Sequence, residues 1–223
     1  MNIIDSLSVP FFEFKCDDAL VDEVLNDLKN HEFIPHSHFG GSDTTAPKKD
    51  VELTKTFYNK KLITWFDQCL EEVRKLYFID TIKLEVTNCW ATKNNLFSKH
   101  HLHNHNQSLV GGIFYLDTCD SAETIFCAPN PWQKYCNDHV MNIANQQLIE
   151  KNLLSTKIKQ EKGKLILFPP HILHGTLPNK KMKTRYVVAF DSFFSGKIHD
   201  NAQWPYFEIK TTSIHDSYLK QEK

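Results

Sequence analysis

Histidine residues that could hold a metal ion are concentrated in one short stretch of the chain. Four of the 12 histidines lie in HHLHNH, residues 100–105, directly ahead of the apolar run LVGGIFYL. Because alternate side chains of a strand share a face, His101, His103 and His105 are predicted to point to one side. Two imidazoles on one face can chelate a first-row metal ion, and a third ligand from a distant strand would complete the set. The alternative interpretation is a surface cluster that binds metal only adventitiously.

A second segment offers that distant ligand. The sequence GKLILFPPHILH, residues 163–174, is typical of a strand that runs into a Pro-Pro corner and then presents His171 and His174. Proline fixes the backbone φ angle, which favours a rigid position for His174 at the mouth of a barrel. The plainer alternative is a strand, a turn and two solvent-facing histidines.

An arginine lies within the apolar strand that follows. In TRYVVAFD, residues 184–191, strand alternation puts Arg185 on the same face as Val187, Ala189 and Asp191. A buried guanidinium is costly unless an anion accompanies it, and its planar shape suits two parallel hydrogen bonds to a carboxylate. We therefore expect Arg185 to pair either with a nearby Asp or Glu or with the carboxylate of a bound ligand.

Taken in order, these segments resemble the iron(II)- and 2-oxoglutarate-dependent oxygenases. The likeness is greatest to a group of bacterial and phage members with the pattern H-x-H, S-G-V-Y-Y-L, F-P-x-x-x-x-H and R-x-x-x-x-F-N. The matching pieces here are His103–His105, GGIFYL at residues 111–116, LFPPHILHGTLPN ending at Asn179, and RYVVAFD at residues 185–191. The resemblance extends over residues 85–195, and it is more specific as an ordered set than in any single piece.

The resemblance implies a double-stranded β-helix, or jelly-roll, fold and a set of site residues. His103, His105 and His174 would be the iron ligands. Arg185 would bind the distal carboxylate of 2-oxoglutarate, with help from the hydroxyl of Tyr115. The metal site and the cosubstrate site would then lie together inside the jelly roll.

The chain departs from the superfamily pattern at two positions. The wider superfamily usually has an aspartate where this chain has His105, so this residue would either bind the metal or support a ligand from behind. His101 is an alternative ligand if the register shifts by two residues. At the end of the last matched strand, Asp191 stands where relatives often have asparagine.

The resemblance also implies an activity. Iron(II), 2-oxoglutarate and O2 would serve a dioxygenase that hydroxylates a peptidyl proline, an amino acid or another small metabolite, with release of succinate and CO2. One alternative is a cupin-type metalloprotein that does not use 2-oxoglutarate. That family shares the GKLILFPPHILH motif but needs a glutamate after the H-x-H pair, where this chain has NQSLVGG. A non-catalytic jelly-roll binding protein is the other alternative.

The elements that would position these residues change in type near residue 80. The spacing of apolar residues predicts a strand in VPFFEFKC, a helix that begins near Asp17 or Asp18, and a second helix over residues 59–78. The stretch IPHSHFGGSDTTAPKKD between the helices is rich in turn formers and is predicted to be an exposed loop. Short strands separated by turn signals follow from Lys83 onward.

This order predicts an α+β, mainly β, chain with a jelly-roll core flanked by N-terminal helices. We expect one domain over residues 1–223, with supporting elements in residues 1–80, the core in residues 81–195 and a tail in residues 196–223 that frays near its end. The polar segment CNDHVMNIANQQLIEKN is predicted to form a helix or a long excursion.

Composition narrows the partners and the compartment. Lys+Arg 26 nearly balances Asp+Glu 27, so nothing indicates binding to nucleic acid or to a membrane surface. The six cysteines form no C-x-x-C pair and are predicted to be reduced thiols in a cytoplasmic protein. We find neither a signal peptide nor an apolar run near the roughly 20 residues that span a bilayer. The expected partner is a small-molecule or peptide substrate, and the oligomeric state is left open, a homodimer included.

Overall fold

The computed structural model describes residues 9–35, 41–45, 57–105, 108–127, 155–198 and 207–219. The helices in these ranges are α1 (Asp18–Lys29), α2 (Lys60–Tyr77) and α5 (Ile214–Leu219). The strands are β1 (Phe12–Lys15), β2 (Ile34–Pro35), β3 (Ser42–Thr44), β4 (Ile82–Asn94), β5 (His100–His103), β6 (Val110–Tyr115), β7 (Cys119–Cys127), β8 (Ser155–Gln160), β9 (Lys164–Phe168), β10 (His174–Thr176), β11 (Arg185–Ile198) and β12 (Phe207–Ile209).

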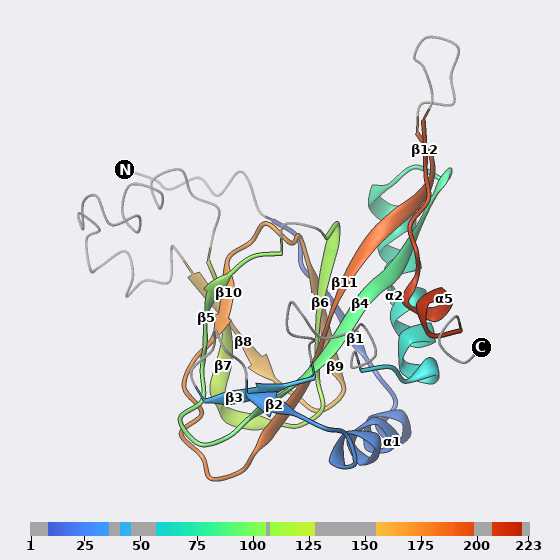
Figure 1. The fold of residues 1–223 in the computed structure, drawn as a ribbon. Helices are drawn as coiled ribbons and strands as arrows, with labels where there is room; N and C mark the ends of the chain where they lie inside the picture. The colour runs from blue at the N-terminus through green and yellow to red at the C-terminus, as the bar shows by residue number, and fades with distance from the viewer. Residues whose placement is uncertain are drawn as a thin grey trace, which may run out of the picture.

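The strands form two antiparallel sheets. The larger sheet has the order β1-β9-β6-β11-β4-β3-β2, with β12 paired to β11, and the smaller sheet has the order β5-β10-β7-β8. Figure 1 shows the smaller sheet on one side of the larger sheet and the helices α1 and α2 on the other. The predicted α+β, mainly β architecture with flanking N-terminal helices is therefore confirmed.

The two long helices begin at residues whose side chains cap them. Asp17 accepts a hydrogen bond of 2.7 Å from the backbone N–H of Ala19, and Asn59 accepts one of 3.0 Å from that of Leu62. Such caps satisfy amides that the first helical turn cannot pair. Each helix then buries one apolar stripe against the larger sheet, as the spacing of its apolar residues predicted.

Apolar side chains form two separate cores, one on each face of the larger sheet. β6 contributes to both because successive side chains of a strand point to opposite faces. Phe114 packs among the helices, with its ring centroid 5.6 Å from that of Phe66. Ile113 and Tyr115 point the other way, into the core shared with the smaller sheet. The larger sheet thus packs against the helices on one face and against the smaller sheet on the other.

Part of the segment predicted as an exposed loop is built into the larger sheet. β2 and β3 form a short hairpin, and β3 pairs with β4 through Ser42↔Asn94 and Thr44↔Thr92. Ser42 and Thr44 are 2% and 3% exposed, so the loop prediction is wrong for this piece. The strand could not be recognised from its polar composition, because backbone pairing with the end of β4 does not require an alternating apolar pattern. Residues 36–40 and 46–50 of the predicted loop lie outside the described residues.

The C-terminal segment is also better ordered than the sequence predicted. β12 pairs with the end of β11, and α5 follows it. Ile214 is buried, and His215 lies 2.8 Å from the Tyr58 hydroxyl and 3.2 Å from an oxygen of Asp67. The prediction that the tail frays is therefore wrong for residues 207–217, because one apolar side chain and one histidine fasten it to the α2 side of the molecule.

The remaining predictions concern cysteines and the segment before β8. The described cysteines are buried and hold no disulfide, and burial raises the pKa of Cys16 to about 11 and of Cys69 to about 12. The thiols were predicted to be reduced, and their raised pKa values further indicate that they react slowly. The predicted helix or excursion in residues 136–152 lies outside the described residues. None of the described helices is long and apolar enough to cross a membrane.

Candidate active site

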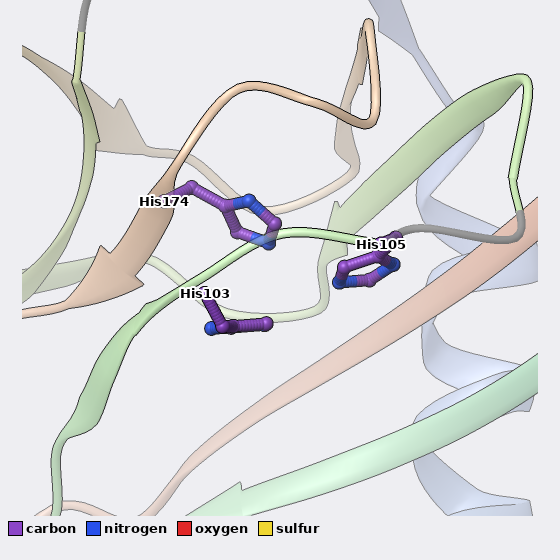
Figure 2. A group of neighbouring side chains, drawn as sticks. All are labelled: His103, His105 and His174. Carbon is purple, nitrogen blue, oxygen red and sulfur yellow. The ribbon is translucent and has the colours of Figure 1, made fainter. Parts of the chain in front are cut away.

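Three histidines from two segments of the chain converge between the sheets. His103 ends β5 and His174 begins β10, and the two residues face each other in the antiparallel pairing of these strands. His105 follows two residues after the end of β5. The possible ligand atoms of the three rings all lie within 4.8 Å of one another, and Figure 2 shows the rings gathered around one point. The structure therefore brings together the three histidines that the resemblance implied.

Each of the three rings is oriented by a hydrogen bond at Nδ1. The Nδ1 atom of His103 lies 2.9 Å from the carbonyl oxygen of His101, and that of His174 lies 3.1 Å from the carbonyl oxygen of Ile172. The Nδ1 atom of His105 lies 2.6 Å from Oδ1 of Asp191. A carbonyl or carboxylate oxygen can only accept here, so Nδ1 carries the proton in each neutral ring and Nε2 carries the lone pair. This is the usual second contact of a metal-binding histidine.

Burial keeps two of these rings in the neutral form that a metal ion needs. Burial is the main cause that lowers the pKa of His174, to about 3, and the neighbouring ring of His103 lowers it further. Burial also lowers the pKa of His103. A histidine binds a metal ion only when its ring nitrogen is deprotonated. The two imidazoles are therefore prepared as ligands at neutral pH.

An irregularity in β5 changes which histidines face inward. β5 and β10 pair through His103↔His174 and through His100↔Thr176, so β5 takes three steps where β10 takes two. The extra residue reverses the expected alternation. His101 is exposed, whereas His100 lines the site and its Nε2 atom lies 3.0 Å from the Ser42 hydroxyl. The prediction that His101 shares a face with His103 is thus wrong, and His101 lies outside the cluster of three rings.

The three histidines line a pocket between the two sheets. Its other lining residues come mainly from β4, β6, β10 and β11: Trp90, Thr92, Asn94, His100, Ile113, Thr124, Gly175, Thr176, Arg185, Val187 and Ala189. The front face of β11 therefore contributes the side chains at positions 185, 187 and 189, as alternation predicted. A cluster of possible metal ligands and a buried arginine open onto one cavity.

Arg185 is a buried cation whose side chain meets no carboxylate in the described part of the chain. The residue is 3% exposed, and its Nε atom has no hydrogen-bond partner. Its guanidinium carbon lies 5.7 Å from the centroid of the Tyr115 ring. Burial lowers the pKa of Arg185 to about 10, so the group is still charged at neutral pH. Of the two expectations for Arg185, the ion pair with an Asp or Glu is not found among the described residues, and a carboxylate ligand remains.

Asn94 is a pocket residue that the sequence did not single out. It pairs directly with Arg185 across β4 and β11, and its side chain is fully buried. Neither Oδ1 nor Nδ2 has a hydrogen-bond partner among the residues that the structure describes. A buried amide that leaves both atoms unsatisfied is unusual in a protein core. The only sequence signal was a polar residue at the inward end of an alternating strand, which is too common to identify a site.

Tyr115 lies beside Arg185 but is already engaged. Its hydroxyl donates a hydrogen bond of 2.8 Å to Oγ1 of Thr124, and Thr124 lines the pocket while Tyr115 does not. Burial raises the pKa of the Tyr115 hydroxyl. The tyrosine ring thus forms a surface under the guanidinium, and its hydroxyl reaches the pocket only through Thr124.

Comparison with known proteins agrees with this geometry. Residues 88–191 match the model of a family described as "Putative 2OG-Fe(II) oxygenase". No curated protein matches the sequence. The resemblance that the motifs indicated is therefore confirmed over residues 88–191.

Several solved structures have a similar fold. HygX from Streptomyces hygroscopicus, crystallised with nickel and 2-oxoglutarate, matches with a TM-score of 0.60 and 13% identity over 91% of this chain and 93% of that chain. A prolyl-4-hydroxylase from Pseudomonas putida matches with a TM-score of 0.55 and 10% identity over 82% and 92%. SnoN, an α-ketoglutarate-dependent epimerase from nogalamycin biosynthesis, matches with a TM-score of 0.57 and 10% identity over 92% and 90%. The predicted jelly-roll fold is confirmed.

The residues of the pocket suit the cofactors of such enzymes. Three imidazoles grouped on one side of an ion are a suitable ligand set for a first-row divalent metal. The unsatisfied Nε of Arg185 and Nδ2 of Asn94 are donors from which a bound carboxylate could accept hydrogen bonds. The possible metal ligands and the possible carboxylate-binding groups thus line one cavity.

Proposed function

We propose that this chain is an iron(II)- and 2-oxoglutarate-dependent oxygenase, with O2 as its oxidant, and that His103, His105 and His174 hold the iron. We further propose that the enzyme hydroxylates its substrate, with release of succinate and CO2. When bound, the iron centre couples the oxidative decarboxylation of 2-oxoglutarate to oxidation of a substrate C–H bond. The observation that carries the proposal is the convergence of three imidazoles beside a buried guanidinium that lacks a carboxylate in the described residues.

Arg185 and Asn94 bind the distal carboxylate of 2-oxoglutarate in this proposal. The two residues are cross-strand partners, so their side chains start from adjacent points of the same sheet. A carboxylate oxygen can accept from the guanidinium and from the Asn94 Nδ2 at once. The ligand would remove the free-energy cost of leaving these polar groups buried without partners. Tyr115 supports the guanidinium with its ring.

The walls around the histidines are suited to keep water from the reacting groups. The ring centroids of Phe168 and Phe126 lie 4.7 Å and 5.7 Å from that of His174, and Ile113 and Val187 line the pocket. An apolar lining strengthens the electrostatic interactions inside it and limits unproductive side reactions. The chain's own residues thus bind, orient and shield, while the redox chemistry belongs to the metal and cosubstrate.

The substrate is proposed to approach past His105. A second hollow lies beside this residue, and it is lined by Ser108, Leu109, Pro169, Pro170 and His171. HygX has been crystallised with hygromycin B, and the other relatives include prolyl hydroxylases. We therefore propose a small metabolite, an amino acid or a peptidyl proline as the substrate.

We also propose that residues 1–223 act as one domain in the cytoplasm. The larger sheet takes strands from each predicted part of the chain: β1, β2 and β3 from residues 1–80, β4, β6, β9 and β11 from the core, and β12 from residues 196–223. A sheet shared in this way does not divide easily into independent units. The buried cysteines without disulfides suit a reducing compartment.

Anaerobic titration of the iron(II)-loaded protein with 2-oxoglutarate tests the proposal. We expect a weak visible charge-transfer band, and we expect Arg185→Ala to retain iron while 2-oxoglutarate binding weakens by about tenfold or more, because a charge-assisted pair is lost. Lys93→Ala, at the neighbouring position of β4 on the opposite face of the strand, should change neither quantity. Absence of the band with the iron demonstrably bound would favour a cupin-type protein, and loss of His103 and His174 without any effect on the protein's activity would favour a binding protein.

A further inference from the structure

Asp191 differs from the other groups that orient the three histidines. His103 and His174 donate to backbone carbonyl oxygens at 2.9 Å and 3.1 Å, whereas His105 donates to a carboxylate at 2.6 Å. A neutral carbonyl is sufficient to fix the tautomer and direction of a ring. The carboxylate therefore adds something that orientation alone does not require, namely a negative charge next to the cluster.

The fold holds this carboxylate in place with a local irregularity. Asp191 lies on the same face of β11 as Arg185, and the β11–β4 register shifts directly after it, so that Thr87 is an extra residue on β4. The Thr87 hydroxyl donates a hydrogen bond of 3.2 Å to the carbonyl oxygen of Asp191. The side chains of Asp191 and His105 are 22% and 11% exposed, so water screens their interaction only partly. Trp90 packs against the His105 ring at 5.5 Å between centroids.

The charge is significant because the three proposed ligands carry none. Neutral imidazoles leave the full double charge of a divalent ion in a pocket that already contains the cationic Arg185. A carboxylate that accepts from Nδ1 makes the opposite nitrogen more electron-rich and places a negative charge one ring away from the metal. We propose that Asp191, acting through His105, is a positioning residue that supplies the anionic character of the metal site and so sets its affinity for a divalent ion. This inference rests on the proposed metal site.

Asparagine and alanine at position 191 separate charge from orientation. Asp191→Asn keeps an oxygen that can accept from His105 Nδ1 and removes only the charge, whereas Asp191→Ala removes both. We would titrate the full-length protein with cobalt(II) alone and follow its visible absorption bands. Both variants are expected to bind cobalt(II) about 10- to 100-fold more weakly than the unmodified protein. If Asp191→Asn binds cobalt(II) like the unmodified protein and only Asp191→Ala is weakened, Asp191 merely orients the ring and the proposal is overturned.

A second measurement distinguishes the loss of charge from general damage to the site. At saturating cobalt(II), we expect Asp191→Asn to bind 2-oxoglutarate as tightly as the unmodified protein or more tightly, because a dianion is drawn to a site that has lost one negative charge. Damage to the pocket would weaken both ligands together. Weaker 2-oxoglutarate binding in Asp191→Asn would therefore also overturn the proposal.

Two histidine variants show which claim has failed if the result is negative. His103→Ala and His174→Ala should abolish cobalt(II) binding in the same titration. If they do, and Asp191→Asn stays within about threefold of the unmodified protein, the role of Asp191 is wrong and the metal site stands. If cobalt(II) binds equally well without His103 or His174, the proposed metal site itself is wrong. His101→Asn, on an exposed residue of β5 whose side chain lies outside the cluster, is the matched control and should bind normally.

Discussion

Asn94 and Arg185 are cross-strand neighbours with buried polar atoms that lack hydrogen-bond partners in the described part of the chain. A satisfied counterpart lies nearby: the Asn179 side chain donates to the carbonyl oxygens of Asn94 and Lys183 and accepts from Ser121. The same residue type is thus fully paired at one position and unpaired at the other. The difference indicates that the Asn94 amide is kept for a ligand and not for the fold, a common compromise between stability and function.

Substitution of Asn94 by leucine should therefore have opposite effects on stability and binding. Asn94→Leu removes two unsatisfied polar atoms, so we expect the free energy of unfolding without ligands to rise by about 1–3 kcal/mol in denaturant titrations. We expect 2-oxoglutarate to bind about tenfold more weakly, as measured by calorimetry with the metal present. Asn179→Leu is the matched control and should lower the free energy of unfolding. A fall for Asn94→Leu as well would mean that Asn94 has a structural role.

At the scale of single elements, the irregular pairing of β5 with β10 decides which rings meet. The extra residue in β5 brings the carbonyl groups of His100 and His101 close to Gly175, where a Cβ atom would lie 2.8 Å and 3.1 Å from their oxygens. Backbone atoms cannot move away as the end of a side chain can. Gly175 is therefore the residue on β10 that permits the irregularity and, with it, the facing positions of His103 and His174.

We expect Gly175→Ala to disturb both the smaller sheet and the metal site. Overpacking against backbone should lower the free energy of unfolding by about 1–3 kcal/mol, and cobalt(II) binding should weaken because His174 is the adjacent residue. Thermal unfolding with and without cobalt(II) measures both effects. Lys159→Thr, at an exposed position of β8 in the same sheet, should stay within about 0.5 kcal/mol. An unchanged metal affinity in Gly175→Ala would show that the pairing is not what positions the rings.

At the scale of the whole molecule, features with a local sequence pattern could be predicted, whereas contacts between distant segments could not. The helices followed from apolar spacing and capping residues, and His103, His174 and Arg185 were identified because each lies in a short ordered motif. The contact of His105 with Asp191 joins residues 86 positions apart, so no local pattern predicted it. Asn94 lacked any signal until its pairing with Arg185 was known. The face of His101 was wrong because simple alternation assumes a regular strand.

The pH dependence of stability also belongs to the whole molecule, because it compares the folded chain with the unfolded one. Burial lowers the pKa of His174 to about 3 and lowers that of His103, while both would titrate near 6.5 in the unfolded chain. Below about pH 6.5 the unfolded state takes up protons that the folded state excludes. The contribution of these two neutral rings to the stability of the metal-free protein is therefore fully present above that pH. It is lost progressively as the pH falls toward 3.

Denaturant titrations of the metal-free protein between pH 7.5 and pH 5 measure this loss. Each excluded proton contributes a slope of at most about 1.4 kcal/mol per pH unit. His174→Leu should flatten the dependence, since its ring no longer distinguishes the two states. His171→Leu is the control: that side chain is exposed in the fold, and its replacement should leave the slope unchanged. Equal slopes for His174→Leu and the unmodified protein would mean that the His174 ring is not held neutral by burial, and its readiness to bind a metal would need another cause.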